Sequence, residues 1–182
     1  YDLTGRGHVN TYALFAEWSL YNINPDGYNG LIVPTGIATD ATTQAFFQKI
    51  VEEQRLKSLF DFENSKGIFP AVHRSFKFCL LTQAGNNNPQ QEFELAFYLT
   101  KVSQLHQPQK RFTLTHDEIE RLNPNTKNCP TFTNKGDAEL TLRIYDNSRV
   151  LKLAEGENPN PWDIELSRMY NMSDDSNLFS TR

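Results

Sequence analysis

The residue pair Phe69-Pro70 stands between two apolar runs and has the type and position best suited to contact a planar ligand. An aromatic ring held by a following proline loses little conformational entropy on binding, and stacking of a base on such a ring is worth roughly 1–3 kcal/mol. A phenylalanine between strand segments is more often ordinary core. The residues alone therefore favour core, and the ligand-contacting interpretation needs further support.

Polar and basic residues near this pair suggest what such a ligand would be. The basic side chains around it are Lys66, His73, Arg74 and Lys77. They are suited to contact nucleic-acid phosphates, although a charged edge strand explains them equally well. Pro34-Thr35-Gly36 ends a short apolar run on the side where ligands bind in open α/β sheets, so this loop either borders a site or is a plain turn.

Other motifs predict no self-sufficient catalytic site. Gly5-Arg6-Gly7 lacks the preceding strand and the Lys-Ser/Thr of a phosphate loop. The four histidines show no metal-ligand spacing, so we expect no metal site. Cys79 and Cys129 are far apart in the sequence and are expected to be reduced thiols. Asp174-Asp175 is expected to be a solvated part of the tail.

Composition indicates an ordinary water-soluble protein of 182 residues with a net charge of -4 and a mean hydropathy of -0.59. We expect no membrane segment, because no apolar run approaches the roughly 20 residues that a spanning helix needs. The absence of a signal-peptide pattern predicts a cytoplasmic location. The negative net charge does not indicate a nucleic-acid binder, although a protein with this net charge can still carry a local basic patch. The chain begins without Met, which suggests a piece of a longer protein.

Hydrophobic periodicity predicts alternating helices and strands in the first half. A helix is expected over residues 9–23, with an inner face of Tyr12, Phe15, Ala16, Leu20 and Ile23. A strand buried on both faces is expected at 31–33, and a helix capped by Thr39 or Asp40 at about 40–55. Strands are expected at 56–62 and 75–80. This order is typical of an α/β sheet.

A composition break at residues 85–89 predicts a boundary that separates a domain of residues 1–84 from an extension of residues 85–182. In this mixed α+β extension we expect a strand at 93–99, a helix opened by the capping box Thr115-x-x-Glu118, a helix at 137–145 and a strand at 164–169. Its basic residues are suited to contact a DNA backbone or to form a solvated face: Arg111, Arg143, Arg149 and Lys152.

Four stretches in this order resemble adenine-N6 DNA methyltransferases, especially the methylase part of Eco57I-like type II restriction-modification enzymes. They read "NTYALFAEWSLYNINPDGYNGLIVPTGIATD", "LFDFENSKGIFPAVHRSFKFCLLT", "FTLTHDEIERLNPNTKNCPTF" and "DAELTLRIY". The resemblance covers most of the chain. It implies a partial doubly wound, Rossmann-like methyltransferase sheet, in which "GLIVP" is an inner strand and "LFDF" and "SFKFCLL" form an antiparallel edge.

The resemblance also implies roles for individual residues. Phe69 would pack against an adenine flipped out of double-stranded DNA, with Pro70 beside it. The family's S-adenosylmethionine loop and Asn-Pro-Pro-aromatic loop belong upstream of Tyr1, so no catalytic residue is expected within this chain, which we expect to be inactive alone. A half-sheet severed from its partner strands exposes an apolar edge, which predicts self-association.

A second interpretation stays open. The same α/β half would serve as a non-catalytic module that contacts DNA or protein in a larger assembly. Methylation of RNA or of a protein amide nitrogen is a weaker third possibility.

Overall fold

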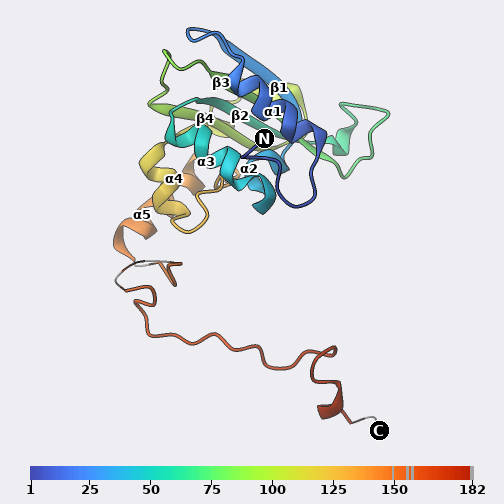
Figure 1. The fold of residues 1–182 in the computed structure, drawn as a ribbon, viewed down its shortest axis with the longest axis vertical. Helices are drawn as coiled ribbons and strands as arrows, with labels where there is room; N and C mark the ends of the chain where they lie inside the picture. The colour runs from blue at the N-terminus through green and yellow to red at the C-terminus, as the bar shows by residue number, and fades with distance from the viewer. Residues whose placement is uncertain (149, 155, 157, 181–182) are drawn as a thin grey trace. The chain divides into compact units, whose positions relative to one another are not determined.

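A computed structural model describes residues 1–148, 150–154, 156 and 158–180 of the chain (Figure 1). Within the described residues, five strands form one sheet in the order β1-β3-β2-β4-β5. They are β1 (Tyr28–Pro34), β2 (Leu56–Glu63), β3 (Lys77–Ala84), β4 (Glu92–Leu99) and β5 (Phe112–Thr115). Strand β3 lies antiparallel between β1 and β2, β4 runs parallel to β2, and β5 runs antiparallel to β4. The expected α/β class with antiparallel strands is confirmed.

The α-helices gather on one face of this sheet. They are α1 (Thr11–Tyr21), α2 (Gly36–Thr39), α3 (Gln44–Glu52), α4 (His116–Leu122) and α5 (Lys135–Asn147). Short 3-10 turns are η1 (Ala41–Thr43), η2 (Asn64–Lys66), η3 (Val102–His106), η4 (Pro108–Lys110) and η5 (Ser176–Leu178). Figure 1 shows α1, α2 and α3 in front of the strands.

Two apolar clusters hold the sheet, one on each face, because successive side chains of a strand point to opposite sides. The main core joins residues of all five helices to one face, with Phe46 and Leu59 fully buried. The smaller cluster on the other face centres on Phe62, Ala96 and Leu99. Among the described residues its cover comes from loop and η3 side chains, and no α-helix packs against this cluster.

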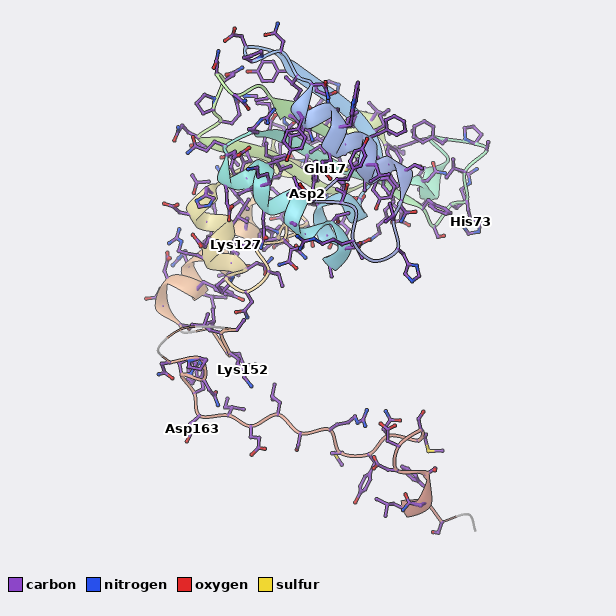
Figure 2. All side chains as sticks on the ribbon, viewed as in Figure 1. Asp2, Glu17, His73, Lys127, Lys152 and Asp163 are labelled. Atoms are coloured by element: carbon purple, nitrogen blue, oxygen red, sulfur yellow. The ribbon has the colours of Figure 1, made fainter. Side chains whose placement is uncertain are left out.

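The buried face of α1 differs from the expected one. The buried side chains are Ala13, Ala16, Glu17 and Leu20, whereas Phe15 is 67% exposed. Two alanines let the helix approach the sheet closely. The Glu17 carboxylate turns inward to accept hydrogen bonds from the N–H of Thr4 (2.9 Å) and from its hydroxyl (2.6 Å). Figure 2 shows Glu17 close to Asp2 of the N-terminal segment.

The strands differ from the expected ones in three places. β1 is an edge strand among the described residues rather than an inner strand buried on both faces, and its Ile32 side chain is 62% exposed. β5 was not expected, because its four residues form a strand only by pairing with β4. The strand expected at 164–169 is absent, since these residues pair with no other strand in the described chain.

Helix α3 begins at Gln44, after η1, so neither Thr39 nor Asp40 caps it.

The chain divides after Ser148 rather than after Ala84. Its two compact units are Tyr1–Ser148 and Arg149–Arg182. The expected boundary between residues 84 and 85 lies within the first unit, because β4 and β5 continue the same sheet. In the second unit the Trp162 indole N–H donates to the carbonyl of Val150 at 3.1 Å.

No helix in the described part of the chain combines the length and the apolar composition that crossing a membrane requires.

Candidate functional site

A cavity of about 400 Å³ opens at the end of the sheet where β1, β2 and β4 finish and β3 begins. The residues that line it are Tyr12, Pro34, Thr35, Gly36, Thr39, Asp40, Asp61, Lys77, Tyr98 and Thr131. The carboxyl end of parallel strands is where open α/β sheets bind ligands. The cavity therefore includes the three loop residues predicted to border a site, together with Lys77.

A buried carboxylate lies at the wall of the cavity. Asp61 is only 2% exposed. Its Oδ1 accepts a hydrogen bond from the Thr35 hydroxyl at 2.6 Å, and its Oδ2 accepts one from the backbone N–H of Tyr98 at 3.1 Å. Buried charge is costly unless it is paired or hydrogen-bonded, and these two donors offset that cost. Asp61 thus ties the end of β1 to β4.

Tyr98 has an unusual backbone conformation beside this carboxylate. Its φ angle is +59°, in the left-handed region that non-glycine residues rarely adopt, and the β2–β4 register shifts here between Phe60 and Phe62. The Tyr98 hydroxyl lies 3.1 Å from Thr131 Oγ1, and Lys77 Nζ lies 5.4 Å from the centre of the Tyr98 ring. The Asp61 hydrogen bond and these two contacts hold the tyrosine in place.

The opposite wall comes from α1 and α2. Burial raises the pKa of the Tyr12 phenol, and the negative charge of Asp40 raises it further, so the hydroxyl stays protonated at neutral pH. Gly36 leaves room for the Asp40 side chain, since a Cβ at this position would lie 2.3 Å from Asp40 Oδ2. Both tyrosines and Asp40 therefore present hydrogen-bonding groups to the cavity.

The loop that carries Phe69 extends from the same end of the sheet but lies off the cavity. The Phe69 ring is 37% exposed and packs edge-on against Phe78 at 4.9 Å between ring centres, next to the smaller apolar cluster. Buried Asn64 accepts from the Phe69 N–H at 2.9 Å and donates to the carbonyls of Phe69 (3.0 Å) and Val72 (2.8 Å). This asparagine fixes the loop and leaves part of the ring accessible.

The predicted DNA-contacting residues divide between these two places. Lys66, His73 and Arg74 lie in the Phe69 loop, and Figure 2 shows His73 where the loop extends beyond the strands. Arg74 folds back over Gly67, whose φ of +72° favours glycine. Lys77 faces the cavity instead. Pro70 is exposed in the loop.

Other candidate residues contribute less. Arg111 forms an ion pair with Glu94, which compensates its charge, and Arg149 lies outside the described residues. In the described part of the chain no cluster of three or more His, Cys, Asp or Glu side chains is able to hold a metal ion. Cys79 and Cys129 are buried free thiols, as predicted, and burial raises the pKa of both.

Local sequence patterns did not predict four residues of this cavity: Tyr12, Asp61, Tyr98 and Thr131. One signal existed for Asp61, which is a charged residue in the otherwise apolar "LFDF" run, two residues after the core residue Leu59. Tyr98 and Thr131 belong to segments far apart in the chain, and only the folded sheet brings them together.

No protein-family model matches the sequence, and no curated protein matches it. Among solved structures, the chain is similar to the type IIG restriction endonuclease BpuSI, with 19% sequence identity and a TM-score of 0.49 over 65% of this chain. The match spans 16% of the length of that enzyme. A likeness this weak does not identify a function.

Proposed function

We propose that this chain is part of an S-adenosylmethionine-dependent DNA adenine-N6 methyltransferase of a restriction-modification system. The observation that carries the proposal is the arrangement of β1, β3 and β2. β3 runs antiparallel between two parallel strands, and the loop that joins β2 to β3 holds Phe69 at their carboxyl end. The sequence resemblance implies both an antiparallel strand pair from these segments and a base-contacting ring in this loop.

The accessibility of Phe69 supports this role. An enzyme that methylates an amine of a paired base must take the base out of the duplex and replace the lost stacking. The ring is anchored on one side by Phe78 and by Asn64, while 37% of its surface stays exposed. Lys66, His73 and Arg74 in the same loop supply groups for the adjacent phosphates.

The free edge of β1 supports a larger sheet. β1 pairs only with β3 among the described strands, and Tyr28 and Ile32 of β1 are more than half exposed. An open edge of this kind pairs readily with a further strand. In the proposed enzyme that strand and the loops that bind S-adenosylmethionine and hold the target amine belong to upstream sequence, so the 182 residues alone are expected neither to bind the cofactor nor to transfer methyl groups. Calorimetry that detects stoichiometric S-adenosylmethionine binding by this chain would contradict this expectation.

Methyl transfer by the longer protein tests the proposal. Labelled S-adenosylmethionine and duplex DNA would be incubated with wild type, Phe69→Ala and the matched control Phe76→Ala, whose ring lies in the same loop and is 58% exposed. Loss of stacking worth roughly 1–3 kcal/mol predicts a fall in kcat/KM of about fivefold to 150-fold for Phe69→Ala and little change for the control. Activity that does not depend on Phe69 would mean that this ring has only a packing role. Absence of activity on any DNA would favour the non-catalytic module.

A further inference from the structure

The cavity at Asp61 has features that the proposed role of Phe69 does not use. A buried carboxylate, two tyrosines and a lysine meet in a space of about 400 Å³, on the face of the sheet opposite the Phe69 ring. Asp61 has no ion-pair partner within 4 Å among the described residues, and each of its oxygens accepts one hydrogen bond from the protein. A carboxylate oxygen has room for a second donor, so the site is able to accept a hydrogen bond from a ligand.

Backbone strain at the same point indicates a functional constraint. Tyr98 has a positive φ at a break in strand pairing, a conformation that a non-glycine residue keeps only where the surroundings enforce it. The hydrogen bond from its N–H to Asp61 enforces it here. The strain positions the tyrosine ring beside the carboxylate, where a relaxed strand would continue past the cavity.

The charges of the cavity select among ligand classes. Asp40 and Asp61 oppose a phosphate, although Lys77 alone would attract one. The same lysine, 5.4 Å from the centre of the Tyr98 ring, offsets one of the two carboxylate charges and so reduces the attraction for a simple cation such as an ammonium group. A neutral, flat ligand that donates a hydrogen bond avoids the repulsion by the carboxylates and the lysine and gains contact with the aromatic rings.

We propose that this cavity binds a nucleobase that carries an exocyclic amine, adenine or cytosine, with Asp61 as the acceptor of an amine hydrogen. The hydroxyls of Thr39, Tyr12 and Thr131 supply donors and acceptors for the ring nitrogens. This inference goes beyond the proposed methyltransferase, because it concerns a second base-binding position that needs neither Phe69 nor cofactor.

Nuclear magnetic resonance titration of the 182-residue chain with adenosine and purine riboside tests it. The two nucleosides differ only at the purine 6-position, where adenosine has an amine and purine riboside a hydrogen. We expect adenosine to bind about tenfold more tightly, because only its amine donates a hydrogen bond to the Asp61 carboxylate. Equal affinities, no binding at millimolar nucleoside, or displacement of adenosine by n-butylamine would overturn the proposal.

Variants connect the discrimination to the cavity. Asp61→Asn keeps the side-chain shape and is expected to remove the preference for adenosine, with its amide spectrum reporting whether the fold persists. Tyr12→Ala leaves Asp61 and its partners intact and is expected to weaken both nucleosides alike, by about fivefold to tenfold. Tyr21→Ala is the matched control on the same helix, 60% exposed and outside this cavity, and is expected to change nothing. A folded Asp61→Asn variant that still prefers adenosine would contradict the role of Asp61 as acceptor of the amine hydrogen.

The titration contains neither S-adenosylmethionine nor duplex DNA, so its outcome is independent of methyl transfer by the longer protein.

Discussion

Asp61 and Phe62 are neighbours on β2, and they belong to opposite faces of the sheet. The Asp61 carboxylate is held by hydrogen bonds from Thr35 and Tyr98 at a cavity beside the helices. The Phe62 ring stacks on Phe78, with 5.4 Å between centres, in the apolar cluster beneath the Phe69 loop. One step along a strand therefore separates a polar site from an apolar one. The end of this sheet thus carries two surfaces, one held by hydrogen bonds to a carboxylate and the other by apolar packing.

Core truncation on each face is expected to have the largest effect. Phe46→Ala removes a fully buried ring from the main core and is expected to lower the free energy of unfolding by about 4 kcal/mol. Phe62→Ala is expected to cost about 3 kcal/mol, because loop side chains around the smaller cluster can move into part of the space. Urea denaturation measures both. A larger loss for Phe62→Ala would mean that the smaller cluster is the more rigid of the two.

Removal of the loop anchor is expected to come next. Asn64→Ala leaves the N–H of Phe69 and the carbonyl of Val72 without their buried partner, at a cost of about 2–3 kcal/mol. Ser65→Ala on the same turn is the control. Proteolysis within residues 66–76 should increase in Asn64→Ala while the cavity face stays folded. Equal stability of the two variants would show that Asn64 does not hold the loop.

The two surfaces differ in how far sequence predicts them. Strand β2 and the capping box of Thr115 and Glu118 were predictable, because periodicity and capping are local. The orientation of Phe15 was not, since the rotation of α1 depends on Glu17 reaching Thr4. The Phe69 loop was found from a contiguous motif and a resemblance. The cavity needed the register of β2 against β4, which no local pattern encodes.

Loss of one donor to Asp61 is expected to have a moderate effect on the polar side. Thr35→Val keeps the side-chain shape and removes a hydrogen bond to a buried carboxylate, which predicts a loss of about 2 kcal/mol. Thr39→Val is the matched control, because its exposed hydroxyl makes only long contacts, to the Thr35 carbonyl (3.3 Å) and to Asp40 Oδ1 (3.4 Å). The difference between these two variants in urea denaturation isolates the contribution of the carboxylate. Equal losses of unfolding free energy in the two variants would mean that the hydrogen bond from Thr35 to Asp61 does not stabilise the fold.

The buried thiols are expected to have the smallest effect on stability, and Cys79 lies close enough to Asp61 to report on the polar face of the sheet. Burial raises the pKa of Cys79 above the ordinary thiol value of 9.0, and the negative charge of Asp61 raises it further. A thiol whose pKa is higher in the folded state stays neutral there while the unfolded chain ionises, so stability is retained below pH 9 and falls as the pH rises beyond it.

At pH 9.5 this predicts a loss of roughly 1 kcal/mol for each thiol relative to pH 8, and Cys79→Ala should remove the Cys79 share. Urea denaturation at the two pH values measures the loss. Cys129→Ala is the comparison, since burial is also the main cause of the raised pKa of Cys129. An unchanged pH dependence in Cys79→Ala would mean that water reaches the sulfur beside Asp61. The cavity would then extend through the sheet face instead of ending at the carboxylate.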